Sequence, residues 1–170
     1  MQSAATTSSN MRVVKGIVLL AFAGYVLRSL LNPSLYVLLD YANLALHEGG
    51  HVFFSPFGEV MTIMGGSLMQ VLMPIGIAVE SEFRRKERFG ASMVLLWAAE
   101  SMANVSVYIA DASARELPLL TDDPDSHDWW QLLGRWDMLA KDHKIAGYVT
   151  TAAWVVFFVG IVLALADIVE

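Results

Sequence analysis

The sequence contains no cysteine among its 170 residues. Disulfide bridges and thiolate zinc sites are therefore excluded, so any metal ion must be held by nitrogen and oxygen ligands. Charge is also scarce, because Asp, Glu, Lys and Arg make up 16% of the chain, against roughly 25% in soluble domains. The net charge of −6 and the lack of a long basic run exclude nucleic acid as an expected partner.

The chain is instead rich in hydrophobic residues. Hydrophobic residues make up 56% of the chain, and several apolar runs approach the roughly 20 residues that cross a bilayer. Residues 13–31, 35–54, 58–80, 89–110 and 145–168 each predict a membrane-spanning helix. We therefore expect an all-α fold, a polytopic membrane helical bundle of about five transmembrane helices with one polar interfacial loop.

The remaining segments are polar. Residues 1–12 are rich in Ser, Thr and Ala and predict a flexible N-terminal tail, which leaves residues 13–170 as a single transmembrane domain. Residues 113–144 form the one long polar stretch, and its three tryptophans suit an extramembrane loop or a short amphipathic helix at the interface. A signal peptide is the alternative for the first apolar run. Since no small-residue cleavage site follows it, we expect a retained helix.

These features predict an integral membrane protein whose first partner is the lipid bilayer, and we place it in the bacterial inner (cytoplasmic) membrane. Basic residues near the first span, Arg12 and Lys15, and the basic cluster at 84–88 are the signals for orientation. With five spans the two groups would lie on opposite sides of the membrane. The tendency of basic loops to stay cytoplasmic therefore gives no single orientation.

An H-E-x-x-H motif occupies residues 47–51, within the second apolar run. On a helix, His47 and His51 are four residues apart and lie on one face, so both imidazoles can bind one metal ion. Glu48 lies beside them and is the usual general base for a metal-bound water. Ionisable residues cost about 2.5–3.5 kcal/mol each at the centre of a span. We therefore interpret the motif as a Zn²⁺ site.

A catalytic zinc ion needs a third protein ligand and one open position for water. Our first candidate is His127 in the polar loop, with Asp128 beside it as an orienting carboxylate. Asp111, at the end of the fourth apolar run, is the alternative ligand, and His143 comes third.

Three further polar residues lie on expected helical faces. Asn43 precedes His47 by one turn, so it could hold an imidazole nitrogen or bond to a neighbouring helix. Asn104 lies on the polar stripe of the fourth run and is a candidate to stabilise an oxyanion. Gln70 shares a face with the glycines at 65–66. This face predicts either a small-residue packing surface or a loosened backbone that receives an extended peptide.

The motif in an apolar helix, the following Gly65-Gly66-Ser67, and the downstream Asn104 and Asp111 together resemble the site-2-type intramembrane zinc metalloproteases. The resemblance covers residues 35–111. It implies a multi-span helical fold, a glutamate base, and zinc on two histidines and an aspartate from a later helix, which favours Asp111. It also implies cleavage of membrane-embedded peptides.

The sequence thus predicts an intramembrane zinc metallopeptidase that cleaves a membrane-embedded or membrane-proximal peptide with zinc-activated water. Two alternatives stay open. The first is a membrane zinc hydrolase that acts on a lipid or small amide. The second is a non-enzymatic metal-binding membrane protein, in which protein ligands fill every coordination position.

Overall fold

The computed structural model describes residues 2–33, 35–121 and 123–170. All regular structure in these ranges is helical, which confirms the predicted all-α fold. The α-helices are α1 (Gln2–Leu31), α2 (Leu38–Phe54), α3 (Glu59–Glu80), α4 (Arg88–Ala110), α5 (Asp128–Arg135) and α6 (Asp142–Val169).

Four segments of the described chain are long and apolar enough to cross a membrane, and they indicate an integral membrane protein. They are Ser9–Leu31, Glu59–Arg85, Arg88–Ala110 and Leu139–Val169. The second apolar run is not among them. Its helix α2 has 17 residues, or about 26 Å at 1.5 Å per residue, which is shorter than the roughly 30 Å hydrocarbon core.

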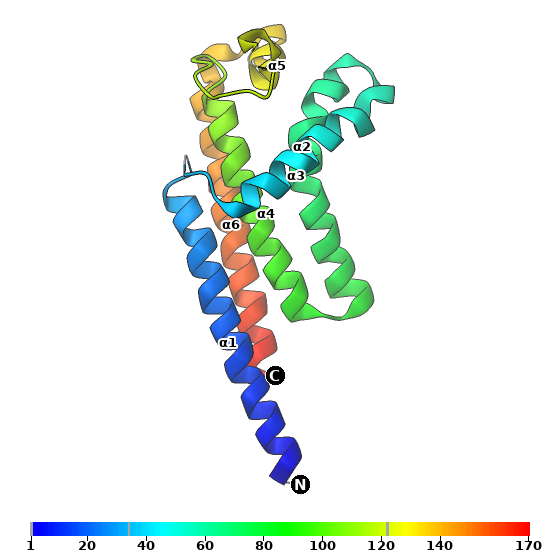
Figure 1. Ribbon diagram of the computed structural model, residues 1–170, viewed down its shortest axis with the longest axis vertical. Helices are drawn as coiled ribbons and strands as arrows, with labels where there is room; N and C mark the ends of the chain where they lie inside the picture. Colours follow the sequence, from blue (N-terminus) through cyan, green and yellow to red (C-terminus); the bar gives the residue numbers. More distant parts are fainter. Residues whose placement is uncertain (1, 34, 122) are drawn as a thin grey trace.

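Helix α2 instead lies obliquely between the end of α1 and the crossing with α3 (Figure 1). It buries Asp40, Asn43 and His47, whose polar groups need protein partners rather than lipid. The oblique path lets these side chains face neighbouring helices. The H-E-x-x-H motif is therefore carried by a helix that packs within the bundle, not by the spanning helix that we expected.

Of the two polar segments, the first differs from expectation and the second forms one of the two expected structures. Helix α1 begins at Gln2, so most of the expected flexible tail at 1–12 is helical. An apolar span supplies the nucleus of this helix, and adding further residues to an existing helix costs little. In the polar stretch at 113–144 the chain forms α5, which buries Leu132 and Leu133 on one side, as a short amphipathic helix does.

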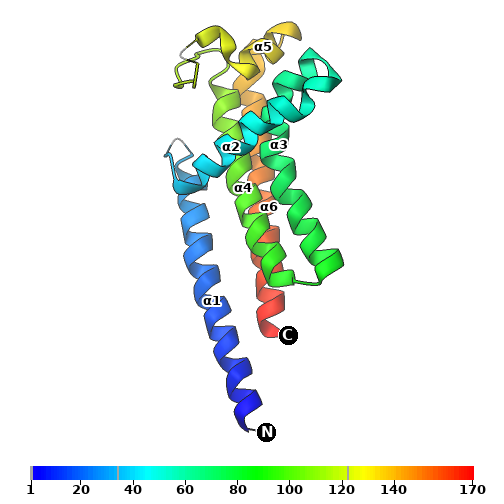
Figure 2. The ribbon, with the colours of Figure 1, turned by 45° about the vertical axis from the view of Figure 1, so that its right-hand side comes forward.

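Close packing of small side chains holds α4 against α6, which run side by side (Figures 1 and 2). On α4, Ala98, Ala99 and Ala103 are at most 1% exposed. On α6, a Cβ added at Gly160 would lie 3.2 Å from the carbonyl oxygen of Ser92. Small residues allow such close approach where lipid provides no hydrophobic driving force between helices. The pair α4 and α6 therefore forms the frame to which the other helices attach.

Backbone contact fixes α2 onto α3. A Cβ added at Gly65 would lie 2.7 Å from the carbonyl oxygen of Gly50, and one added at Gly50 would overlap the carbonyl of Gly65. Helix α3 is continuous through these glycines and through Pro74. The glycines at 65–66 thus form a packing surface, and the alternative of a loosened backbone that receives a peptide strand is not what the structure contains.

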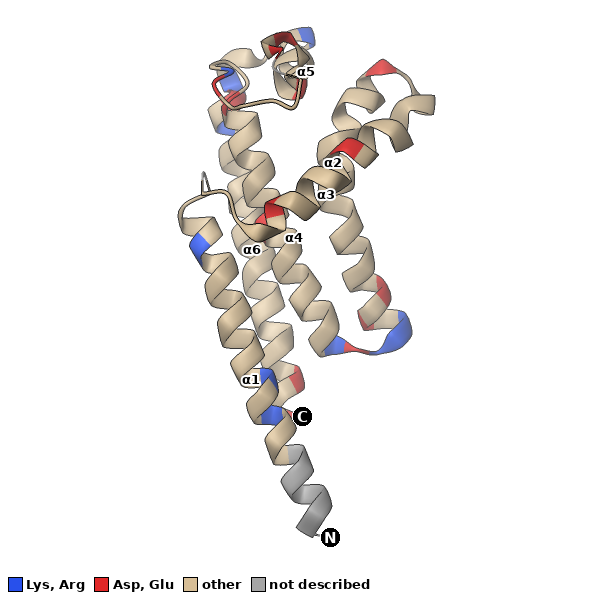
Figure 3. Ribbon diagram, in the orientation of Figure 1, with Lys and Arg blue, Asp and Glu red and all other residues tan. Residues whose placement is uncertain are grey.

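Both chain ends lie at the same end of the bundle as the α3–α4 turn, whereas α5 lies at the opposite end (Figures 1 and 2). Because α2 does not cross, Arg12, Lys15 and the basic cluster at 84–88 lie on one side, where Lys and Arg gather in Figure 3. The conflict between the two basic groups in the five-span prediction is therefore removed.

Candidate metal centre

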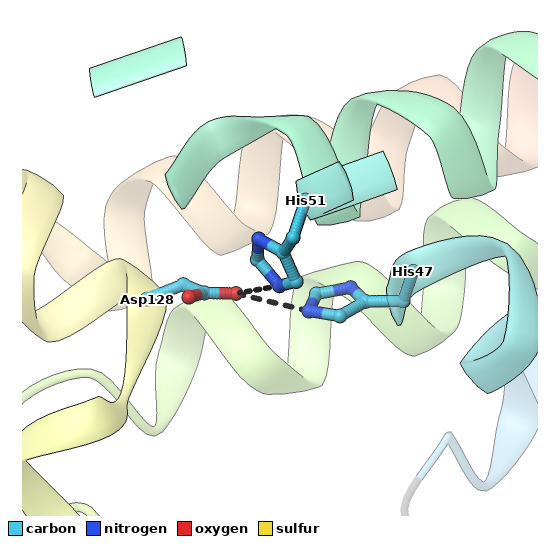
Figure 4. Close-up of side chains that lie close together, drawn as sticks. All are labelled: His47, His51 and Asp128. Carbon is cyan, nitrogen blue, oxygen red and sulfur yellow. Dashed lines mark hydrogen bonds and ion pairs between the residues drawn. The ribbon is translucent and has the colours of Figure 1, made fainter. Parts of the chain in front are cut away.

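Three side chains from α2 and α5 converge at one point, and we call His47, His51 and Asp128 the histidine cluster (Figure 4). The Oδ2 atom of Asp128 lies 2.9 Å from Nε2 of His47 and 3.3 Å from Nε2 of His51. One nitrogen or oxygen atom from each residue lies within 4.8 Å of the other two. His47 and His51 reach the same point because residues four apart share a helix face.

The spacing of these atoms fits zinc. Zn–N and Zn–O bonds of about 2.0–2.1 Å in a tetrahedron place neighbouring ligands roughly 3.3 Å apart. The separations of 2.9 and 3.3 Å from Asp128 Oδ2 to the two imidazoles are close to this value. Three protein donors would leave one tetrahedral position open, which is the arrangement of a catalytic rather than a structural zinc ion.

A backbone carbonyl on α3 orients one imidazole. The Nδ1 atom of His51 lies 2.8 Å from the carbonyl oxygen of Thr62. Since a carbonyl only accepts, Nδ1 must carry the proton in this contact, and in the neutral ring the lone pair then lies on Nε2. Nε2 is the atom that faces Asp128. Thr62 thus performs the role that outer-shell acceptors play for metal-binding histidines.

Glycine 66 on α3 leaves room for the two imidazoles. A Cβ added at Gly66 would lie 2.6 Å from Nε2 of His47 and 2.7 Å from Nε2 of His51. Any side chain here would displace the two atoms that would bind the metal. The close crossing of α2 and α3 therefore positions the rings as well as the helices.

The start of α5 delivers the third side chain. Asp128 is the first residue of α5, and its backbone N–H donates to the hydroxyl of Tyr108 over 3.0 Å. One turn later, Leu132 is fully buried. Asp128 and Leu132 share the inner face of the helix, so burial of the leucine turns the carboxylate toward α2.

The electrostatics of the cluster couple the carboxylate to the imidazoles. The close contact with Asp128 raises the pKa of His51 to about 9, against the opposing effect of burial. Burial alone would raise the pKa of Asp128, but the hydrogen bond with His47 and the close contact with His51 outweigh it and hold that pKa below its usual range. Imidazole protons and a divalent cation are thus alternative partners for this carboxylate, as expected where metal binding releases protons.

The structure places Asp128, and neither His127 nor Asp111, beside the two imidazoles. His127 is the N-cap of α5, and its Nδ1 accepts the N–H of Trp130 over 3.2 Å. Its buried ring packs against Tyr108 with centroids 4.2 Å apart and the planes tilted by 33°, and burial lowers the pKa of His127. Neighbouring residues at a helix start point in different directions, so only one of the pair 127–128 can face α2.

Asp111 serves the loop instead of the metal centre. Its two carboxylate oxygens accept the backbone N–H groups of Glu116 over 2.9 Å and Leu117 over 3.1 Å. Oδ2 also lies 3.3 Å from Nε2 of His127, in a geometry that does not qualify as a hydrogen bond. Asp111 therefore stabilises the turn after α4, and its carboxylate lies beside His127 rather than beside His47 and His51.

Asn43 bonds to α4 rather than to His47, which is the second of the two roles considered for it. It donates to Oε2 of Glu100 over 2.8 Å. Its Oδ1 accepts from Trp97 over 2.9 Å and from Ser101 over 2.7 Å. We call these four residues the asparagine network. Glu100 is fully buried and Asn43 is 1% exposed, so the network ties α2 to α4 inside the bundle.

A cavity of about 450 Å³ opens beside the histidine cluster. Glu48 and His47 line it, together with Tyr108 from α4. Gln70 and Asn104 also line it, and they are linked to each other and to Asp40. Gln70 donates to Asn104 over 2.8 Å, and Asn104 donates to Asp40 over 2.7 Å. The rest of the wall is mainly apolar: Pro33, Leu35, Tyr36, Leu44, Val107 and residues 117–120.

Sequence reasoning missed three features of this centre. Asp128 was assigned an orienting role behind His127, whereas the structure places its carboxylate directly beside both imidazoles. The apolar Leu132 four residues later points to an inward Asp128 only once α5 is known to begin at this residue. The carbonyl of Thr62 carries no sequence signal, because every residue has one. Tyr108 lay on the expected polar stripe but was not assigned a role.

Comparisons with protein-family models, with curated proteins and with solved structures find no match for this chain.

Proposed function

We propose that this chain is an intramembrane zinc metallopeptidase, of the site-2-protease-like type, that cleaves a membrane-embedded or membrane-proximal peptide. The observation that carries the proposal is the histidine cluster next to the cavity that Glu48 lines. Two imidazoles, one carboxylate and an open fourth position match the ligand set of catalytic zinc sites. A purely structural or storage site would fill all four positions with protein.

Different residues of the chain would have different roles in the reaction. Zinc, when bound, polarises a substrate carbonyl and lowers the pKa of a bound water toward about 7. Glu48 is exposed to the cavity, so its carboxylate can take the proton from the attacking water and pass it to the leaving nitrogen. Thr62 and Gly66 hold the imidazole rings in place during these steps.

The charge of the cavity favours an internal peptide bond. Its charged lining groups are the acids Asp40 and Glu48, and no lysine or arginine is among the described residues that line it. Apart from the metal ion itself, a phospholipid headgroup or the terminal carboxylate of a peptide would find no cationic side chain of the lysine or arginine type there. A neutral amide flanked by apolar side chains meets no such penalty.

A membrane hydrolase for a neutral lipid or a small amide is the second candidate. The cavity volume of about 450 Å³ lies in the range of sites for small molecules, roughly 300–1,000 Å³. The same apolar wall would accept an acyl chain. A non-enzymatic metal-binding protein is the less supported alternative, because such a protein needs neither the open position nor the adjacent Glu48.

We further propose that the protein resides in the bacterial inner membrane with its basic end in the cytoplasm. The support is that the start of the span Ser9–Leu31, which carries Arg12 and Lys15, and the basic cluster at 84–88 lie at the same end of the bundle. Figure 3 shows Lys and Arg at this end and further ones around α5. Basic segments near span ends are retained on the cytoplasmic side. In this orientation α5 faces the other side.

The proposed function is tested by stripping the purified protein with a chelator, reconstituting it in vesicles and restoring zinc. Two probes are offered: a quenched fluorescent peptide with an apolar membrane-spanning segment, and a neutral fluorogenic acyl amide. We expect zinc to restore cleavage of the peptide. Glu48→Gln should lower the rate by about 10²–10⁴-fold while the bound zinc stays unchanged, and Glu116→Gln, at an exposed acid, should behave like the wild type.

Each remaining outcome has a meaning. Cleavage of the acyl amide alone would replace the peptidase with the second candidate. Equal rates for the wild type and Glu48→Gln would contradict any zinc hydrolase built on this motif.

A further inference from the structure

Tyr108 lines the same cavity as Glu48 and His47. Its ring is held from two sides. It packs against His127 with centroids 4.2 Å apart and the planes tilted by 33°, and it makes an edge contact with His47 at 5.7 Å. The hydroxyl oxygen accepts the N–H of Asp128 over 3.0 Å. This hydroxyl is therefore fixed against the residue that supplies the third donor of the histidine cluster.

The proton of this hydroxyl is still available. A tyrosine hydroxyl can donate one hydrogen bond and accept others. The N–H of Asp128 uses an accepting position, and within the described ranges the hydroxyl donates to no protein acceptor. Because the oxygen already faces a donor on one side, its own proton points elsewhere, and Tyr108 borders the cavity.

The proposed reaction needs a hydrogen-bond donor next to the metal centre. When water attacks an amide, negative charge develops on the carbonyl oxygen, and a fixed donor aimed at that oxygen lowers the barrier. Asn104 was the sequence-based candidate for this task, but its amide donates to Asp40, and Gln70 donates to Asn104. Those amides hold one another in place, whereas the Tyr108 hydroxyl adjoins the metal centre.

We propose that Tyr108 is a catalytic residue whose hydroxyl donates a hydrogen bond to the carbonyl oxygen of the scissile amide in the transition state. This inference rests on the proposed function. Tyr108 keeps its proton throughout the reaction. The proton of the attacking water passes through Glu48 to the leaving nitrogen, so no further acid or base is needed.

Tyr25 offers a matched control. Its hydroxyl accepts the N–H of Leu39 over 3.0 Å, in the first turn of α2, just as Tyr108 accepts the N–H of Asp128 at the start of α5. Tyr25 does not line the cavity. Tyr25→Phe and Tyr108→Phe therefore remove equivalent structural hydrogen bonds, and only the second also removes the donor near the metal centre.

The experiment compares Tyr108→Phe, Tyr25→Phe and Glu48→Gln as zinc-loaded proteins. For Tyr108→Phe we expect kcat on the quenched peptide to fall by about 10²–10³-fold, with KM and zinc content unchanged. Affinity for a phosphinic peptide, a tetrahedral mimic of the transition state, should fall at least tenfold, whereas Tyr25→Phe should match the wild type in every measurement.

The inference is overturned if Tyr108→Phe keeps wild-type kcat and phosphinic peptide affinity while Glu48→Gln is inactive, because the peptidase then stands without a role for this hydroxyl. It is also overturned if Tyr108→Phe loses zinc, since the residue would then only position Asp128. A wild-type protein that neither cleaves the peptide nor binds the phosphinic mimic overturns both proposals together.

Discussion

Two groups of buried polar side chains share helix α2, and they differ in how completely the protein satisfies them. In the asparagine network, Asn43 has partners for both ends of its amide, and Glu100 accepts from Asn43 and from Ser29 at 3.5 Å. Among the residues that the structure describes, the histidine cluster brings three donors to one point, and it borders a cavity. We call the asparagine network closed, because its polar groups are paired with one another, and the histidine cluster open, because it borders a cavity.

This difference separates a structural role from a chemical one. Both groups put costly polar residues inside an apolar bundle, so residue type alone does not distinguish them. A closed group stabilises helix packing, because each buried donor and acceptor is paired. An open group leaves room for the metal ion and the substrate that we propose for this site. We therefore expect changes in the two groups to affect different measurements.

Asp128→Asn should have the largest effect on metal binding. It replaces an anionic donor with a neutral amide, so zinc affinity should fall by more than the roughly 10–100-fold typical of outer-shell residues. Titration of the purified protein against a chromophoric chelator measures this change. Asp125→Asn, at an exposed position three residues earlier, should bind zinc like the wild type. Equal affinities for the two variants would remove Asp128 from the metal centre.

Gly66→Ala sharpens the comparison by disturbing the histidine cluster without touching a ligand. The added methyl group would lie 2.6 Å from Nε2 of His47, so we expect zinc affinity to fall by about 10–100-fold through displaced imidazoles. Gly76→Ala on the same helix meets no atom within 4 Å and should bind zinc normally. Both variants should keep wild-type helicity by circular dichroism, and a Gly66→Ala protein with normal affinity would argue against this packing.

The histidine cluster should also determine how the stability and the zinc affinity of the protein depend on pH. The pKa of His51 is raised to about 9 by Asp128, from an ordinary value near 6.5. Because the folded state binds this proton more tightly, the metal-free protein gains stability that is fully present below about 6.5 and lost as pH rises through about 9.

Zinc competes with the same proton, so zinc affinity should rise over this window, by about tenfold per pH unit while one proton is displaced. Tm of the metal-free protein and zinc titrations across this range measure both trends. A rising Tm of the metal-free protein with flat zinc affinity would contradict the coupling.

Asn43→Ala should have the smallest effect on zinc and a clear effect on stability. It leaves buried groups of the asparagine network without partners, which costs about 1–3 kcal/mol of unfolding free energy. Unfolding in mixed detergent measures this loss. Glu100→Gln keeps an acceptor for Asn43 and should cost less. If Asn43→Ala instead lost zinc with its stability intact, the division between the two groups would fail.

The convergence of His47 and His51 could be predicted from the sequence, whereas the sequence did not decide between His127 and Asp128 as their neighbour. The positions of His47 and His51 follow from helix periodicity, which is a local property. The choice between His127 and Asp128 depends on where α5 begins and which of its faces is buried. That is set by contacts with distant residues such as Tyr108, and a shift of one residue exchanges the two side chains.

The predicted number of about five spans exceeds the four candidates in the structure for a related reason. The run at 35–54 is apolar enough to suggest a crossing, yet its helix α2 has only 17 residues. Gly50 and Gly65 bring α2 against α3, and Asn43 bonds it to α4. These contacts between distant segments hold α2 obliquely against α3 and α4, with one side buried and the other exposed. The four longer apolar segments needed no such contacts to be recognised.

The most direct test of the metal centre is the X-ray absorption spectrum of zinc bound to the purified protein. The structure predicts two imidazole nitrogens, together with oxygen donors that include a carboxylate of Asp128, at about 2.0–2.2 Å. In Asp128→Asn the carboxylate contribution should disappear while both imidazoles remain. A spectrum with three imidazoles, as ligation by His127 would give, or with four protein donors and no open position, would contradict the account.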